Sequence, residues 1–70
     1  MKLSDLISQY EKGILSHHCN IEYLERRLAN LTEDASEELI IDTKRGITFN
    51  WHSVNLLTDI INDLKQVTEL

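Results

Sequence analysis

The chain has 70 residues, one cysteine and no proline, with 12 acidic against 7 basic side chains and a formal net charge of −5. One cysteine excludes an internal disulfide, and the acidic balance disfavours binding to nucleic-acid phosphates, which requires clustered Lys and Arg. A domain of this size buries only about 60% of its unfolded surface, so oligomerisation or docking on another protein is the remaining common way to stabilise it.

Neither a membrane span nor a secretion signal is evident in the sequence. No apolar run approaches the roughly 18–20 residues that a membrane-spanning helix needs. The first residues meet an acid at Asp5 without an apolar signal-peptide core. We therefore expect one domain over residues 1–70, with no membrane contact and a cytoplasmic location in which the lone thiol stays reduced.

A heptad pattern occupies the first 31 residues. Alternating steps of four and three residues keep one stripe of a helix turned toward a partner helix. The pattern crosses Gly13 and Asn20 without a slip, although glycine inside a helix costs about 1 kcal/mol relative to alanine. It predicts one long, coiled-coil-like helix over residues 2–31, in preference to two helices that break near Gly13. Its positions are Leu3, Ile7, Tyr10, Ile14, His17, Ile21, Leu24, Leu28 and Leu31.

Seven of these positions are the predicted self-association residues of a homodimer. Isoleucine at a with leucine at d is typical of parallel two-stranded coils, but the sequence leaves parallel and antiparallel dimers open. His17 would meet its counterpart in one core layer, where a polar pair can set the register or loosen the assembly near pH 6. The seven are Ile7, Tyr10, Ile14, His17, Ile21, Leu24 and Leu28.

The segment over residues 36–51 permits two interpretations. Its apolar residues alternate with polar ones on both sides of Gly46, and β-branched residues are dense, which favours a β-hairpin with strands 39–43 and 47–51. The alternative is a short third helix that starts near Ser36 and is closed by Gly46, which would make the chain all-α. We favour the hairpin.

A last helix is predicted over residues 53–68, with Ser53 as its N-cap and Asn50 as an alternative cap. Its apolar face is broader than a two-stranded seam needs, which indicates contact with two neighbours. We expect it to pack antiparallel on the first helix. At 1.5 Å per residue the last helix would be about 22 Å long and the first about 45 Å long, so half of the first helix would stay uncovered.

Catalytic and metal-binding patterns are weak. His17, His18 and Cys19 are consecutive, and consecutive helical residues point about 100° apart, so they cannot close on one ion from one helix. The two glycines, Gly13 and Gly46, are too few to form a phosphate-binding loop. The sequence also has no G-x-S-x-G motif and no cysteine with a histidine at a spacing typical of catalysis. We expect no enzyme activity, no cofactor and no metal site.

Three aromatic residues are the predicted partner-binding residues, because aromatic side chains dominate interface hot spots. They are Tyr23, Phe49 and Trp51. Phe49 and Trp51 have a second interpretation, as anchors of a β-hairpin within the small core.

The chain resembles short accessory proteins of phages and other mobile elements. The resemblance rests on the charged helical stretch over residues 21–28 and the closing stretch over residues 56–64. It implies a role exercised by binding a host protein. The sequence thus predicts a small non-enzymatic module that self-associates through its first helix and binds an unknown protein. The alternative is a nucleic-acid-associated regulator that gathers Arg26, Arg27, Lys44 and Arg45, or an acidic mimic of nucleic acid that acts as an inhibitor.

Overall fold

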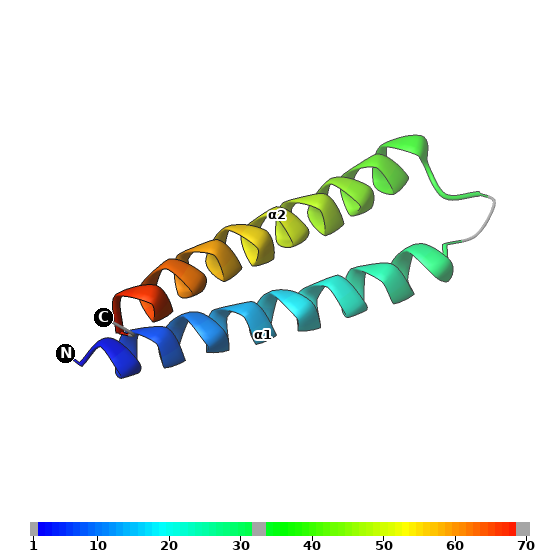
Figure 1. Ribbon diagram of the computed structural model, residues 1–70. Coiled ribbons are helices and arrows are strands. Elements are labelled where there is room, and N and C mark those ends of the chain that lie inside the picture. Colours follow the sequence, from blue (N-terminus) through cyan, green and yellow to red (C-terminus); the bar gives the residue numbers. More distant parts are fainter. Residues whose placement is uncertain (1, 32–33, 69–70) are drawn as a thin grey trace.

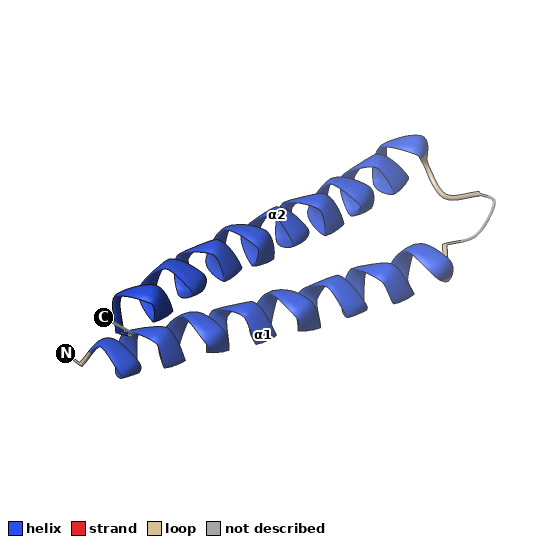
Figure 2. Cartoon of the chain, in the orientation of Figure 1, coloured by secondary structure: helices blue, strands red, loops and turns tan. Residues whose placement is uncertain are grey.

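Two long helices lie side by side and antiparallel, joined by one short connection (Figures 1 and 2). The computed structural model describes residues 2–31 and 34–68, with residue 68 described in its backbone only. Helix α1 spans Leu3–Ala29 and helix α2 spans Glu37–Thr68. They form a rod of 56 × 15 × 14 Å, and both chain ends lie at the end opposite the connection (Figure 1).

The prediction of one long first helix is confirmed. Helix α1 runs through Gly13 and Asn20 without interruption, as its unbroken heptad spacing requires. It stops at Asn30, whose backbone N–H donates to the carbonyl oxygens of Arg26 and Arg27, at 3.0 and 3.2 Å. Arg26 and Arg27 in the last turn are favourably placed for the negative end of the helix dipole.

The predicted β-hairpin over residues 36–51 is wrong, because this segment is the first half of α2. Ser36 caps the helix, since its Oγ accepts a hydrogen bond from the Leu39 N–H at 3.1 Å. Glu37 and Glu38 then place negative charge in the first turn, where the helix dipole favours it. The start proposed for the alternative third helix is therefore correct.

Helix α2 does not stop where the sequence predicted a stop. Gly46 has no positive φ and lies inside α2, so it does not end a helix. Ser53 is not an N-cap, because its Oγ donates to the Phe49 carbonyl oxygen one turn earlier, at 3.1 Å. Two predicted elements are thus one helix of 32 residues.

A second heptad pattern on α2 explains its continuity. Two of its positions are polar and buried, Thr43 and Asn50, and these obscure the pattern in the sequence. Each donates to a carbonyl oxygen one turn earlier in the helix: Thr43 Oγ1 to Leu39 at 2.8 Å and Asn50 Nδ2 to Gly46 at 2.7 Å. We call this set the inner seam, and it consists of Ile40, Thr43, Ile47, Asn50, Val54, Leu57, Ile61 and Leu64.

The expected length mismatch is also wrong. Helix α1 has 27 residues and α2 has 32, about 40 and 48 Å, so α2 extends along all of α1. The core is nevertheless thin. Among the described residues, only Ile21, Val54 and Ile61 are buried apolar side chains, and none is completely enclosed. Most residues of the helix interface are only half-buried, because two helices alone leave one side of the interface open to solvent.

Replacing Gly13 by alanine is expected to raise the free energy of unfolding by about 1 kcal/mol, because alanine is the better helix former. The added Cβ would lie 3.4 Å from Leu57 Cδ1, an ordinary contact. For a domain of this size the midpoint of thermal unfolding should rise by roughly 4–8 °C. Gly46→Ala is the matched control. Its Cβ would lie 3.1 Å from Leu24 Cδ1, so its gain should be smaller. Equal gains from both changes would contradict this packing.

Candidate interaction surface

The predicted self-association residues of α1 lie on the face that packs against α2. Ile21 is buried, and the other six are half-buried: Ile7, Tyr10, Ile14, His17, Leu24 and Leu28. Their apolar spacing is therefore already used inside one chain. Contact between these residues and a second copy of the chain stays a prediction.

A polar layer crosses the middle of the helix pair. The Asn50 amide is oriented by its Nδ2, which donates to the Gly46 carbonyl oxygen at 2.7 Å. Its Oδ1 accepts from His17 Nδ1 at 2.7 Å and from Asn20 Nδ2 at 3.4 Å. Since an amide oxygen only accepts, His17 must carry its proton on Nδ1. His17 thus has a partner on α2 of its own chain, in the layer where a histidine pair was predicted.

The three predicted partner-binding aromatics are all exposed, but they do not form one cluster. Tyr23 is 62% exposed on α1, and Phe49 is 66% exposed on α2. Trp51 is 42% exposed, and its ring stands perpendicular to that of His18 with centroids 5.5 Å apart, so this contact connects the two helices. The interpretation of Phe49 and Trp51 as hairpin anchors in the core is wrong, because both lie on a helix and both side chains are exposed.

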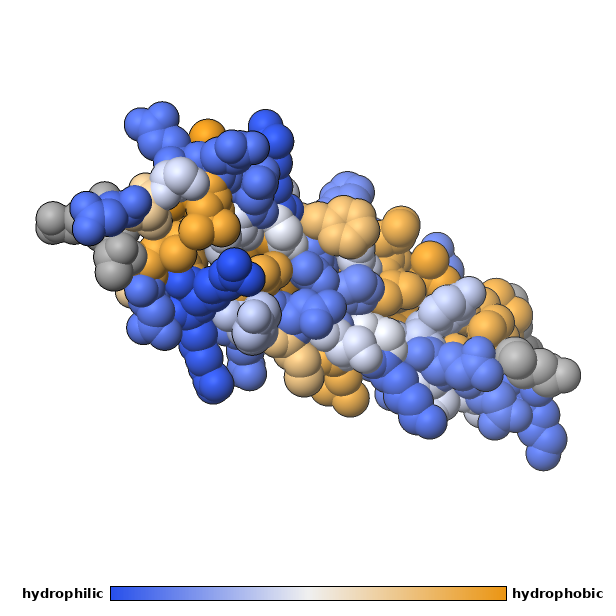
Figure 3. Space-filling model, turned by 180° about the vertical axis from the view of Figure 1, so that it is seen from behind, coloured by the Kyte–Doolittle hydropathy of each residue, from blue (hydrophilic) through white to orange (hydrophobic). Residues whose placement is uncertain are grey.

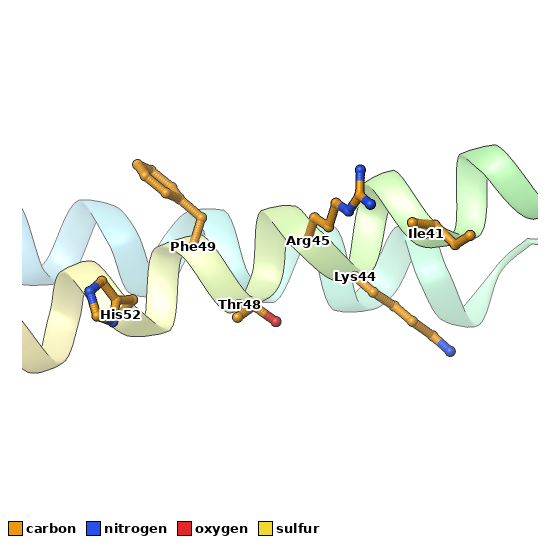
Figure 4. Close-up of a pocket in the computed structure, with 6 residues that line it drawn as sticks. All are labelled: Ile41, Lys44, Arg45, Thr48, Phe49 and His52. Carbon is orange, nitrogen blue, oxygen red and sulfur yellow. The ribbon is translucent and has the colours of Figure 1, made fainter.

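A shallow hollow of about 570 Å³ lies on the outer surface of α2. All six lining side chains come from this one helix, and α1 lies behind it in the view of Figure 4. A hollow on one helix has no opposite wall, so it cannot exclude water from a reacting centre. Its residues are Ile41, Lys44, Arg45, Thr48, Phe49 and His52.

A second row on α2 is mostly apolar and only partly covered by α1, since Ser53 and Ile60 are half-buried and its other four residues are exposed. Its positions also alternate steps of four and three residues, offset from the inner seam, and we call it the outer seam. Phe49 is 66%, Leu56 is 56% and Val67 is 60% exposed. Figure 3 shows hydrophobic side chains reaching the surface along the molecule between hydrophilic ones. The outer seam consists of Phe49, Ser53, Leu56, Ile60, Asp63 and Val67.

Sequence reasoning identified Phe49 but missed Leu56, Val67 and the exposed Leu15 of α1 as surface residues. Leu56 and Val67 belong to the broad apolar face that the sequence predicts over residues 53–68. The available signal was the breadth of that face, which predicted contact with two neighbours. Extending its heptad spacing back to Phe49 would have separated the two seams.

Metal-binding and membrane-spanning features are not found in the part of the chain that the structure describes. Within residues 2–31 and 34–68, no three His, Cys, Asp or Glu side chains gather to hold a metal ion. Cys19 is exposed with a free thiol. Neither α1 nor α2, as described, contains a stretch with the length and apolar character needed to cross a bilayer.

Comparison of this chain with protein-family models, with curated proteins and with solved structures finds no match. The candidate surface is therefore defined by its own geometry: a thin helical hairpin with apolar side chains exposed along α2.

Proposed function

We propose that this chain is a non-enzymatic protein-interaction module that self-associates and binds another protein through helix–helix contacts. The supporting observation is the imbalance between buried and exposed apolar side chains. Three apolar residues are buried, whereas seven large ones are at least 42% exposed among the described residues. Soluble monomers rarely leave large contiguous apolar patches in water, and such patches mark interaction sites.

The geometry of a two-helix rod supports binding over catalysis. The hollow on α2 is open, and ligand sites usually enclose most of their ligand. A helix pair exposes long ridges that fit the grooves of further helices, which gives four-helix bundles when two hairpins meet. The resemblance to phage accessory proteins extends the proposal to a protein partner from a host cell.

The concentration dependence of thermal unfolding tests the self-association. For a folded dimer that dissociates on unfolding, a hundredfold increase in protein concentration adds about 2.7 kcal/mol of stability. For two 70-residue chains this corresponds to roughly 5–10 °C in the unfolding midpoint. We expect this rise in circular dichroism melts. An unchanged midpoint across that range would refute self-association coupled to folding.

A further inference from the structure

We infer that the outer seam of α2 is the contact surface for a second copy of this chain, which lies antiparallel along it. The inference rests on the proposed self-association and specifies its surface, orientation and register. The seam from Phe49 to Val67 covers 19 residues, about five turns and about 28 Å of helix. Its spacing of four and three residues is the one by which two helices interlock.

The charges beside the outer seam point to a second copy. Arg45, His52 and Asp59 are spaced by seven residues, so they form one exposed row along an edge of the seam, and Asp63 lies in the seam itself. Beside the outer seam the row is basic at Arg45 and His52 and acidic at Asp59, while Glu38, one heptad before Arg45, lies ahead of the seam. A surface with this reversal is complementary to itself when the second copy is antiparallel, because a two-fold interface brings each half against the other.

Two antiparallel registers place Phe49 against an apolar residue of the second copy, since the register shifted the other way puts it against Ser53. The charge row distinguishes these two registers. In the first, Phe49 faces Ile60 of the second copy, His52 faces Asp59, and Asp63 lies beside Arg45. In the second, shifted by seven residues, Phe49 faces Val67 but Asp59 meets its own counterpart. Like charges directly opposed destabilise a helix pair. We therefore assign the first register.

Each apolar contact occurs twice in this register because of the two-fold axis. Phe49 of each copy packs on Ile60 of the other, and Leu56 of each copy lies over Ser53 of the other. These contacts, repeated by the two-fold axis, cover the side chains of Phe49 and Leu56, which are exposed in the single chain. The α1 face that packs on α2 keeps its contacts, so the hairpin does not need to open.

Leu56→Asp tests the surface. Leu56 is 56% exposed in the single chain, so the variant should retain its helical circular dichroism, while an aspartate inside the interface should weaken the dimer by about 100-fold or more. Leu15→Asp is the matched control. Leu15 is 64% exposed on α1, outside the outer seam, and its replacement should leave the dimer dissociation constant unchanged. Dissociation constants are measured by sedimentation equilibrium on the full chain.

Charge reversal tests the orientation. Arg45→Glu and Asp63→Lys should each weaken the dimer by on the order of tenfold, because each places like charges together twice. Both changes in one chain should restore the parental dissociation constant, since the antiparallel contact is then reversed but intact. In a parallel dimer Arg45 would face Arg45, so the single changes would have little effect.

The outcomes separate this inference from the proposed function. If the parent dimerises and Leu56→Asp dimerises equally well, the inference is overturned while self-association stands, through another face. If Leu15→Asp alone weakens the dimer, α1 is the interface and the inference is again overturned. If the parent remains a single chain when concentrated, both the inference and the proposed self-association are overturned. Loss in Leu56→Asp with restoration in the double charge variant establishes the surface and its orientation.

Discussion

Ile21→Ala is expected to lower the free energy of unfolding by about 3 kcal/mol, because large-to-small changes at buried aliphatic positions cost about 2–5 kcal/mol. Ile21 is 3% exposed and is the only buried residue of α1. A 70-residue chain has roughly 4–10 kcal/mol of stability in total, so the loss removes a large share of it. Urea unfolding followed by circular dichroism measures the change.

Leu15→Ala is the matched control for Ile21→Ala, since it removes a similar apolar volume from an exposed position of the same helix. It should change the free energy of unfolding by no more than about 0.5 kcal/mol beyond its propensity effect. A cost at Leu15 equal to that at Ile21 would contradict the placement of α1 on α2. It would mean that the other side of α1 carries the packing.

Replacing Asn50 alone by leucine is expected to lower the free energy of unfolding by about 2 kcal/mol, because His17 then loses its acceptor and faces an apolar side chain. His17→Leu alone leaves the Asn50 amide oxygen with only the long contact from Asn20. Replacing both by leucine removes the polar layer as a unit. The double variant should be at least as stable as the parent, because an apolar pair can replace a buried polar pair without penalty.

The three variants form a double-mutant cycle, and its interaction free energy is the decisive quantity. We expect a coupling of more than about 2 kcal/mol between residues 17 and 50, because the double variant regains the cost of both single changes; it is measured by urea unfolding at constant protein concentration. Additivity within about 0.5 kcal/mol would show that the hydrogen bond does not connect the helices. Dimer mass should be compared as well, because buried polar layers can fix register and oligomeric state.

The first helix was predictable because one period accounts for its whole length. The second was not, since Thr43 and Asn50 occupy core positions where the heptad pattern requires apolar residues. With those two positions discounted, the remaining alternation around Gly46 has the period of a strand. In the structure Thr43 and Asn50 bond to carbonyl oxygens one turn earlier, which makes them compatible with a buried helical face.

The sequence allowed the exposed aromatic residues of the candidate surface to be predicted, but not the helix on which most of the exposed apolar surface lies. The sequence indicated exposed aromatics, and Tyr23, Phe49 and Trp51 are all exposed. It assigned the surplus apolar surface to α1, because the partner helix was expected to be short. Helix α2 extends along all of α1, and five of the seven large exposed apolar side chains lie on α2, including Phe49, Leu56 and Val67. The broad apolar face expected over residues 53–68 therefore indicated the surface better than the expected length mismatch.

The mass of the unmodified chain in solution tests the central claim most directly. That claim is that two helices leave too much apolar surface in water, so the hairpin associates. Light scattering across a dilution series should give twice the 8.2 kDa of one chain at high concentration, falling toward 8.2 kDa on dilution. A constant 8.2 kDa at every concentration, with helical circular dichroism unchanged, would contradict the account.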